Sequence, residues 1–470
     1  MKQLATENAP SQGTLRRNAL WRLISWGFIS AVNVANGVMV ARVLGAEGKG
    51  AWALVMFTAH WVGELCSLGL QVAASYFVGR RGWSPRWVLR TNLLVSSVLW
   101  AATALVLGLL HREIHHWLDL SPTGAMALAL VLIGLPIDIA GGHLVGILRA
   151  EEQITQVCIA ETARHVAWLA LTLAVLFAYR GGLVELSVVF LASHLIQAVV
   201  GWWYFARRSR PDTSQPPHAE QAMAPLVAYG FGNLLIRILA YSTARMDLLV
   251  VQHYVGPAGV GVYSVAMSGA ELMGVAGGAL PYVLLPRIAS SGREQETRVG
   301  AAAHRVAVLQ GLIMVIPLAP LGIVLPVVYG PSFSGAVVPF WICLGGLLLR
   351  PPSMVLDQLF IGGGRASIVT AYQLAGFGVM LGLDFVLVPR HGVSGAAVGY
   401  AVALLVQYVL ALGAISRSGV APLRELFSFR REEWRLFTLR RTKTNQERPD
   451  TTANLPASDL GAEPRAEREE

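Results

Sequence analysis

Twelve runs of about 20 or more mostly apolar residues limit what this chain can fold into, because each is long enough to cross a bilayer as a helix. They fall at 20–41, 51–79, 88–110, 124–148, 154–178, 183–206, 223–252, 259–286, 302–328, 335–361, 368–388 and 393–415. The 470 residues are 54% hydrophobic and only 14% charged. The sequence therefore predicts an all-α polytopic membrane protein rather than a soluble multidomain chain.

Basic residues concentrate in alternate short connections between these runs. One set of connections is rich in arginine and the other is poor, holding Arg42, Lys49, Arg112, Arg180 and Arg390. Cytoplasmic loops of membrane proteins carry the excess of Lys and Arg, and both tails lie on the richer side. We therefore predict that both termini are cytoplasmic.

An internal repeat divides the twelve spans into two sets of six. Residues 43–52 (VLGAEGKGAW) are echoed by residues 254–263 (YVGPAGVGVY) between the first and second span of each set. Two further groups match in the same order, Pro136, Gly146, Arg149 and Ala150 with Pro352, Gly362, Arg365 and Ala366, and Arg180, Gly182, Leu195 and Gln197 with Arg390, Gly392, Leu405 and Gln407. An even number of spans per repeat gives both halves the same orientation. We expect two six-helix lobes related by a pseudo-two-fold axis along the membrane normal.

The repeat and the changes in composition set the predicted boundaries. They are a cytoplasmic tail at 1–17, a first lobe at 18–206, a cytoplasmic linker at 207–221, a second lobe at 222–416, a basic interfacial segment at 417–443 and a disordered tail at 444–470. Between 417 and 443, apolar residues alternate with arginines at helical spacing, which is typical of a helix lying on an anionic leaflet. The last segment is polar and rich in Glu, which is typical of disorder.

Charged residues lie inside several of the apolar runs. Asn233, Arg237, Tyr241 and Arg245 recur every fourth residue, so they fall within an arc of roughly 120° on one helical face. A charge at mid-bilayer costs at least ~2.5 kcal/mol, so this face is expected to point into the bundle or a watery cavity. Asp247 is two residues from Arg245 and points the other way, so the two are not expected to pair.

The first span carries an equivalent polar stripe of Arg22, Trp26, Ser30, Asn33 and Asn36, and the second span adds His60, Glu64, Ser67, Gln71 and Ser75. The repeat partner of the second span contributes Ser264, Ser268 and Glu271, and Asp138, Glu161, Arg164, Arg350 and Asp357 lie in other spans. Glu161 and Arg164, spaced i, i+3, are either mutually neutralising or functional. Arg350 precedes Pro351 and Pro352, which predict a broken helix that is either a binding or gating feature or a packing kink.

Several kinds of chemistry have no support in the sequence. Gly48-Lys49-Gly50 lacks the first glycine and the Ser/Thr of a phosphate-binding loop. Cys66, Cys158 and Cys343 form no paired motif and are expected to be core residues. His111 and His115 have metal-ligand spacing but lie at a solvated helix end. We predict no metal, no cofactor and no nucleic-acid partner, and the short outer loops argue against an enzyme.

Three segments carry a family resemblance: Leu15 to Arg22, Ala41 to Trp52, and Leu68-Gly69-Leu70. They resemble polysaccharide transporters of the Wzx type, whose superfamily also holds multidrug MATE exporters and lipid II flippases. The resemblance implies a MATE-like fold in a bacterial inner membrane, moving undecaprenyl-pyrophosphate-linked oligosaccharide from the cytoplasmic to the periplasmic leaflet by alternating access. Membrane lipids and other polysaccharide-assembly proteins are the further partners that it implies. The two additional helices of lipid II flippases are not found in the sequence.

The intramembrane charges suit an anionic headgroup, because guanidinium binds phosphate oxygens through paired hydrogen bonds. The predicted substrate-binding residues are Arg237, Arg245, Arg350, Arg164 and Arg22 for the pyrophosphate, and Tyr241, Asn33, Asn36 and Gln71 for sugar hydroxyls. The carboxylates predicted to couple transport to an ion or proton gradient are Glu64, Asp247, Glu271 and Asp357. The alternative is a cation-coupled multidrug antiporter, which would favour carboxylates and aromatic faces over arginine.

Overall fold

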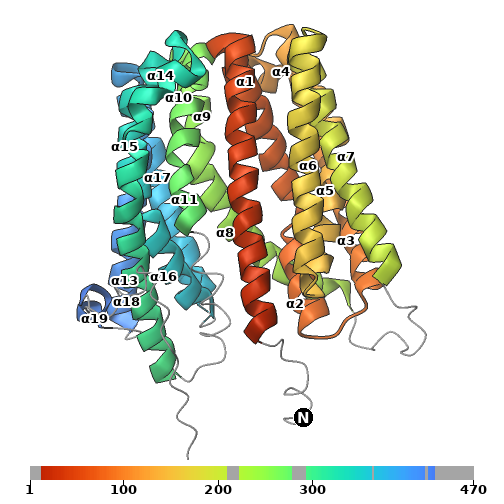
Figure 1. Ribbon diagram of the computed structural model, residues 1–470, viewed down its shortest axis with the longest axis vertical. Helices are drawn as coiled ribbons and strands as arrows, with labels where there is room; N and C mark the ends of the chain where they lie inside the picture. Colours follow the sequence, from red (N-terminus) through yellow and green to blue (C-terminus); the bar gives the residue numbers. More distant parts are fainter. Residues whose placement is uncertain (1–11, 209–221, 278–292, 363–364, 419–421, 429–470) are drawn as a thin grey trace, which may run out of the picture. The chain divides into compact units, whose positions relative to one another are not determined.

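The computed structural model describes residues 12–208, 222–277, 293–362, 365–418 and 422–428, which are helical with short connections and contain no strand. The predicted all-α fold is confirmed (Figure 1). The first lobe comprises α1 (Gln12–Ser67), α2 (Leu70–Gly79), α3 (Pro85–Leu109), α4 (His111–Leu118), α5 (Pro122–Ala150), α6 (Ile154–Leu173), the π-helical turn η1 (Ala174–Ala178) and α7 (Leu183–Arg208).

The second lobe begins with α8 (Met223–Arg245), α9 (Asp247–Val255), α10 (Pro257–Ala270) and α11 (Leu272–Gly277). It continues with α13 (Arg293–Leu318), α14 (Leu321–Tyr329), the 3-10 turn η2 (Pro331–Ala336), α15 (Val337–Leu347), α16 (Arg350–Gly362), α17 (Ala366–His391), α18 (Val393–Ser418) and α19 (Leu423–Phe427). In Figure 1 the helices α13, α15 and α17 of this lobe lie on the left, and α5, α6 and α7 of the first lobe lie on the right.

Ten helices among the described residues are long and apolar enough to span a membrane. One of them, Ile24–Ser67, corresponds to the first two predicted spans, because a non-helical Gly45 divides α1 into two segments. The eighth predicted span, 259–286, corresponds to α10 and α11 and continues outside the described part of the chain. The helix count of the structure therefore agrees with the predicted arrangement.

The repeated glycine turns have the same conformation and pack against each other. Gly45 has φ 69° and ψ −171°, and its repeat partner Gly256 has φ 87° and ψ −177°, a backbone region that favours glycine. A Cβ at Gly50 would lie 1.8 Å from the carbonyl oxygen of Pro257, and a Cβ at Gly261 would lie 2.0 Å from that of Ala46. Because Ala46 and Pro257 are also repeat partners, the contact is reciprocal. This confirms the pseudo-two-fold relation between the lobes.

A second close approach between the lobes involves the Leu68-Gly69-Leu70 segment, where α1 gives way to α2. A Cβ at Gly69 would lie 2.4 Å from the carbonyl oxygen of Gly230 in α8, and one at Gly230 would lie 2.6 Å from that of Leu68. Only residues without a side chain allow two backbones to come this close. The lobes therefore touch at both ends of the second segment of α1.

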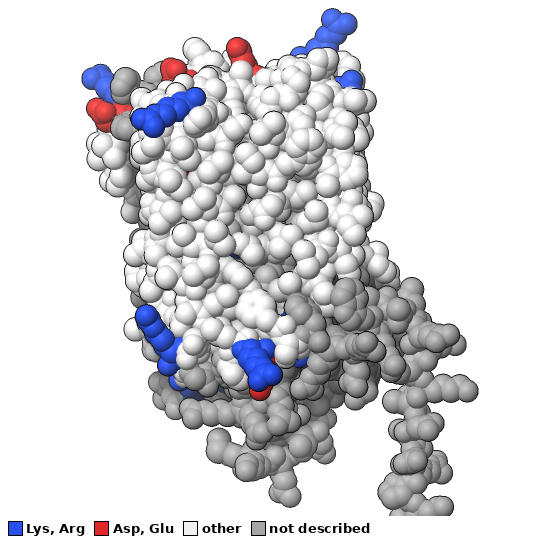
Figure 2. All heavy atoms as spheres, turned by 90° about the vertical axis from the view of Figure 1, so that its left-hand side faces the viewer, with Lys and Arg blue, Asp and Glu red and all other residues white. Residues whose placement is uncertain are grey.

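The outer surface suits a hydrocarbon environment. Figure 2, which faces the side of the second lobe, shows a broad uncharged band with Lys, Arg, Asp and Glu gathered near its two ends. Large apolar side chains such as Ile316 and Val327 are each 73% exposed. Exposed aliphatic side chains around a helical bundle are stable in lipid but not in water. The chain is therefore a multi-pass membrane protein.

Prolines inside the spans are accommodated locally. Pro136 in α5 cannot donate to the carbonyl of Leu132, and the indole Nε1 of Trp100 donates to that oxygen instead, at 2.9 Å. The predicted break at Arg350 is confirmed, since α15 ends at Leu347 and α16 begins at Arg350. Pro351 and Pro352 thus occupy the first turn of a helix, where a missing N–H costs little.

Much of the predicted terminal and linker segments falls outside the described residues, namely 1–11, 209–221, 419–421 and 429–470. Within 417–443, the short α19 packs on α13. His304 of α13 places Nδ1 3.3 Å from the carbonyl oxygen of Leu426, and the guanidinium of Arg305 donates to that of Glu425. The predicted boundaries between the tails, the lobes and the linker remain predictions.

Candidate functional site

A cavity of about 390 Å³ lies between the two lobes. Its walls come from both segments of α1, from α8 and α9, and from α10 and α11, with single residues from α6 and α14. Five predicted site residues line it, namely Asn33, Asn36, Tyr241, Arg245 and Glu271. A cavity of this size is in the usual range for small-ligand sites. Part of each predicted polar stripe, Ser30 to Asn36 in the first span and Tyr241 to Arg245 in the seventh, therefore faces an interior space.

Arg245 ends α8 and points to the opposite wall of the cavity. Its Nη2 donates a hydrogen bond of 2.5 Å to Oε2 of Glu271, the residue between α10 and α11. It does not pair with Asp247, as predicted. Tyr241, one turn earlier, lies against Phe57 and His60 of α1, with ring centroids 6.0 and 4.3 Å apart. The polar face of α8 is thus already engaged with groups across the cavity.

Lys49 is a cavity residue that the sequence interpretation placed in an outer loop. It follows the Gly45 turn by four residues, so it lies in the second segment of α1 and lines the cavity. Within the described residues its ammonium has no hydrogen bond or ion pair, and it interacts electrostatically with Arg245. Among the described lining residues Glu271 is the only carboxylate, so these residues together carry one positive charge in excess.

Asn36 lies beside Lys49 in the cavity wall. It is only 1% exposed, and neither its Oδ1 nor its Nδ2 has a hydrogen-bond partner among the described residues. Both Lys49 Nζ and Tyr329 Oη approach the neighbouring Gly37, within 4.0 and 3.8 Å of where a Cβ would stand. A buried amide without partners is costly, so this corner is suited to a polar ligand.

Two other predicted arginines lie outside the cavity lining, each paired with a glutamate. Arg237 of α8 donates from Nε to Oε2 of Glu64 at 2.9 Å and from Nη2 to Oε1, so this bidentate pair joins the two lobes. Arg22 of α1 donates to Glu161 of α6, which also accepts a longer contact of 3.5 Å from Arg149. In this conformation their charges are neutralised.

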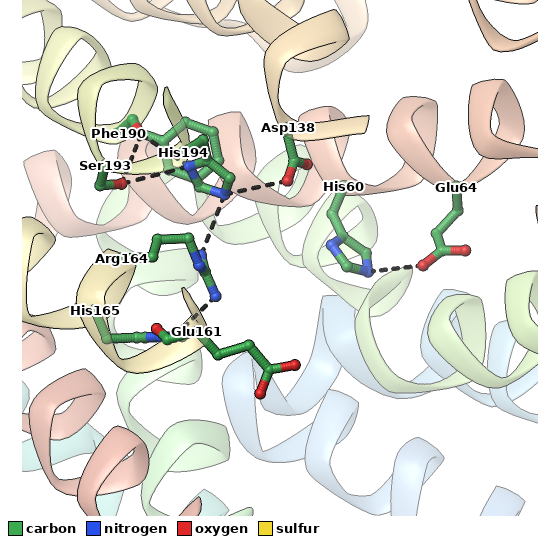
Figure 3. Close-up of polar contacts among 9 residues, drawn as sticks. All are labelled: His60, Glu64, Asp138, Glu161, Arg164, His165, Phe190, Ser193 and His194. Atoms are coloured by element: carbon green, nitrogen blue, oxygen red, sulfur yellow. Dashed lines mark hydrogen bonds and ion pairs between the residues drawn. The ribbon is translucent and has the colours of Figure 1, made fainter. Parts of the chain in front are cut away.

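Arg164 belongs to a cluster inside the first lobe (Figure 3). Its Nη1 lies 3.1 Å from Nε2 of His194, and its Nη2 lies 2.9 Å from Nε2 of His165. The predicted i, i+3 pairing of Glu161 with Arg164 does not form, because Glu161 bonds to Arg22 and Arg149 instead. Asp138 of α5 completes the cluster, with Oδ1 3.3 Å from His194 Nε2.

A pair of buried acids lies in the second lobe. Asp247 at the start of α9 accepts a hydrogen bond from Tyr263, while its Oδ1 has no partner among the described residues. Asp384 of α17 interacts electrostatically with Asp247, and neither of its carboxyl oxygens has a partner there. Both side chains are 0% exposed. Buried carboxyls of this kind require protons or a cation.

The sequence interpretation did not include Asp384. The available signal was a single acidic residue within an otherwise apolar span, 368–388.

Three predicted residues lie elsewhere and outside the cavity lining. Asp357 accepts a hydrogen bond from Tyr372, Arg350 begins α16, and the amide of Gln71 lies against Gly142 of α5.

The family described as "Polysaccharide biosynthesis protein" matches residues 122–334 of the chain. The resemblance to polysaccharide transporters is confirmed. No curated protein matches this sequence. A multidrug resistance MATE family transporter of the MOP superfamily, in its inward-facing conformation, has a TM-score of 0.68 at 18% identity, with 86% of this chain and 98% of that chain covered.

The lipid II flippase MurJ, in an inward closed conformation, has a TM-score of 0.64 at 11% identity over 87% of this chain and 89% of its own. A MOP superfamily transporter from Pyrococcus furiosus has a TM-score of 0.58 at 15% identity, covering 87% and 96%. At these identities the similarity establishes a shared fold. The predicted MATE-like architecture is confirmed, and these structural neighbours are transporters or flippases.

Proposed function

We propose that the protein is a flippase that moves undecaprenyl-pyrophosphate-linked oligosaccharide from the cytoplasmic to the periplasmic leaflet by alternating access. The observation that carries this proposal is the excess positive charge of the cavity, whose described lining holds Lys49 and Arg245 against one carboxylate, Glu271. A pyrophosphate is a strong anion that such a site would bind through charge-assisted hydrogen bonds. The match to a polysaccharide biosynthesis family supports the same substrate class.

Different residues bind different parts of the substrate headgroup. Lys49 and Arg245 bind the pyrophosphate, and Asn33, Asn36 and Tyr241 bind sugar hydroxyls in the same cavity. Arg22 and Arg237 hold helices together in this conformation and become available when their glutamate pairs open. Arg164, Arg350 and Gln71 lie outside the cavity and do not contact the headgroup in this conformation. The polyprenyl chain stays in the bilayer, so only the polar headgroup crosses.

Transport is driven by an ion or proton gradient through the buried acids of the second lobe. Asp247 lies two residues after Arg245 at the junction of α8 and α9, so binding a cation there would act on the cavity wall directly. Asp384 supplies the remaining unpartnered oxygens. Glu64 and Glu271 contribute to coupling because protonation of either would break its ion pair with Arg237 or Arg245. Asp357 is a further candidate for a coupling carboxylate.

In a bacterial inner membrane both termini are cytoplasmic, because the arginine-rich connections lie on their side. The end of the bundle where α9 meets α10, opposite the start of α1 in Figure 1, is then periplasmic. The protein is a transporter rather than an enzyme, and polysaccharide-assembly proteins of the same membrane are its expected partners.

Reconstitution tests the function. The full chain is placed in liposomes that contain undecaprenyl-pyrophosphate-linked oligosaccharide, and a lectin or glycosidase outside measures the glycan in the outer leaflet. We expect exposure of the glycan to be faster than in protein-free liposomes. No acceleration with any polyprenyl-linked glycan, in the presence of a sodium or proton gradient, would contradict the proposal.

A cation-coupled multidrug antiporter is the second candidate. Trp52, Phe57 and Trp168 in the cavity lining and the buried Asp247 and Asp384 favour it, since aromatic faces and carboxylates attract organic cations. The same liposomes can be loaded with a fluorescent cationic dye. Gradient-driven dye movement without glycan exposure would favour the antiporter over the flippase.

A further inference from the structure

The position of one ring hydrogen in His194 can be deduced from its surroundings. Nδ1 lies 2.8 Å from the main-chain carbonyl oxygen of Phe190, one turn earlier in α7. A carbonyl oxygen only accepts, so Nδ1 carries a hydrogen and donates it. The protonation state of His194 is therefore decided at Nε2 alone.

Nε2 of His194 has two neighbours that make opposite demands (Figure 3). The Nη1 of Arg164 at 3.1 Å can only donate, so it needs a lone pair on Nε2. The Oδ1 of Asp138 at 3.3 Å accepts as a carboxylate, so it needs a hydrogen on Nε2. One nitrogen cannot meet both demands at once. A single proton therefore decides whether His194 bonds to Arg164 or to Asp138.

His165 provides an internal comparison. Its Nδ1 lies 2.7 Å from the main-chain oxygen of Glu161, and its Nε2 lies 2.9 Å from Nη2 of the same Arg164. These contacts match those of His194. In the described part of the chain, however, no side-chain carboxylate contacts His165. His194 thus has a carboxylate neighbour, Asp138, that favours an imidazolium, and His165 has none among the described residues.

The charged groups that face His194 come from two helices packed against α7. They are Asp138 from α5, and Arg164 and His165 from α6. From α1, Trp52 lies 6.5 Å from the Phe190 ring, which in turn lies 4.0 Å from His194, and His60 interacts electrostatically with Asp138. Asp138 is 39% exposed while His194 is 5% exposed, so a proton can reach the site through Asp138.

We propose that Asp138, His194 and Arg164 form a proton-binding site in the first lobe, where protonation moves the Nε2 bond of His194 from Arg164 to Asp138. The site adjoins the cavity through two aromatic residues that line it, Trp52 beside Phe190 and Trp168 at 6.5 Å from His165. A change in the hydrogen bonds of His194 would therefore act on the cavity wall through these aromatic contacts. The proton site itself does not depend on the proposed function, whereas its coupling to transport does.

Solid-state NMR of the full chain in liposomes, with ¹⁵N-labelled histidine, tests the site directly. Variants H194N and H165N assign the two signals. On acidification across the range of about pH 8 to 5 in which histidines titrate, we expect His194 to convert to an imidazolium. The ring of His165 is expected to keep its hydrogen on Nδ1 only. An imidazolium at His165 with a neutral His194 would overturn the proposal.

Asp138→Asn tests the role of the carboxylate alone. The amide has no negative charge to stabilise an imidazolium, but it can donate a hydrogen bond to a neutral Nε2 of His194. We expect the imidazolium signal of His194 to disappear over the same range in this variant. An unchanged titration would overturn the role of Asp138. The ring of His165 serves as the control for the integrity of the fold.

Coupling is tested with the glycan-exposure assay. In the wild type we expect transport to depend on pH, and in Asp138→Asn we expect this dependence to be lost. A dependence identical in both would overturn the coupling. A titrating His194 together with no transport at any pH would contradict the proposed function and leave the proton site standing.

Discussion

At the scale of single residues, Lys49 decides the charge of the cavity. A lone ammonium within a membrane protein is expensive, so a residue of this kind usually serves a ligand. Arg245 is a like charge in the same cavity, and Lys49 has no carboxylate partner in the described part of the chain. Its role is therefore separable from that of the arginines, whose glutamate partners already neutralise them.

We predict that Lys49→Met raises the KM for the lipid-linked oligosaccharide by roughly 10- to 100-fold. The basis is the loss of one charge-assisted hydrogen bond, worth about 1.5 to 3 kcal/mol. Lys49→Arg should retain most of the affinity. Initial rates of glycan exposure at several substrate densities give the KM. As a control, Arg112→Met removes an exposed charge with no contact in the described structure and should change nothing. An unaltered KM in Lys49→Met would remove Lys49 from the binding site.

The buried acids allow a second prediction at this scale. Asp384→Asn should abolish the acceleration of transport by a sodium or proton gradient, because the amide removes a charge from a site without hydrogen-bond donors. Stability should not fall, since burying a neutral amide costs less than burying an unpaired carboxylate. Transport with and without a gradient is the measurement. Asp357→Asn is the comparison, since Asp357 accepts a hydrogen bond from Tyr372 whereas the Asp384 oxygens have no partner among the described residues. A gradient response that survives in Asp384→Asn and is lost in Asp357→Asn would reverse the assignment.

At the scale of elements, the two glycine turns form one of the closest contacts between the lobes. Gly50 and Gly261 face the carbonyl oxygens of Pro257 and Ala46 at distances that no Cβ can occupy. Backbone cannot move aside as a side chain can, so even a methyl group forces the helices apart. The symmetry of the contact makes the two positions equivalent.

We therefore predict that Gly50→Ala and Gly261→Ala each destabilise the protein by about 1 to 3 kcal/mol. Thermal unfolding in detergent, followed by circular dichroism, should give a lower midpoint for both and a similar change for each. Gly232→Ala in α8 is the matched control, since nothing lies within 4 Å of a Cβ there and alanine favours a helix. If Gly232→Ala lowered the unfolding midpoint by the same amount, the loss of stability could not be attributed to the contact between the glycine turns.

The elements were largely predictable from the sequence, and their partners were not. Apolar runs and the repeat locate the spans and even the Gly45 turn, because lipid requires helices and φ above zero favours glycine. Pairs such as Glu64 with Arg237, 173 positions apart, depend on how helices rotate and dock. Lys49 entered the cavity because α1 resumes directly after Gly45, whereas a basic residue between two spans resembles a loop.

At the scale of the whole molecule, alternating access requires that contacts between the lobes break at one end and form at the other. In the middle, Glu64 bonds to Arg237. At the proposed periplasmic end, the guanidinium of Arg42 donates from Nε to the carbonyl of Val328 at 2.7 Å and from Nη2 to that of Val327. Both acceptors belong to the last turn of α14, where carbonyls lack helical partners. Arg42 therefore caps a helix of the opposite lobe and closes this end.

The last prediction concerns this closure. Arg42→Ala should increase access to the cavity from the periplasmic side by roughly tenfold, the factor expected for about 1.4 kcal/mol lost from the closed state. A cysteine at Asn33 reports access through its rate of reaction with a membrane-impermeant maleimide. Cys66, Cys158 and Cys343, all buried and free, are first replaced by alanine. Arg390→Ala removes an arginine of the same side that has no bond within the described residues, and it should leave the rate unchanged. Equal rates in Arg42→Ala and its parent would mean that other contacts hold this end closed, such as the reciprocal glycine turns or the hydrogen bond from Gln252 of α9 to the carbonyl oxygen of Leu118 in α4.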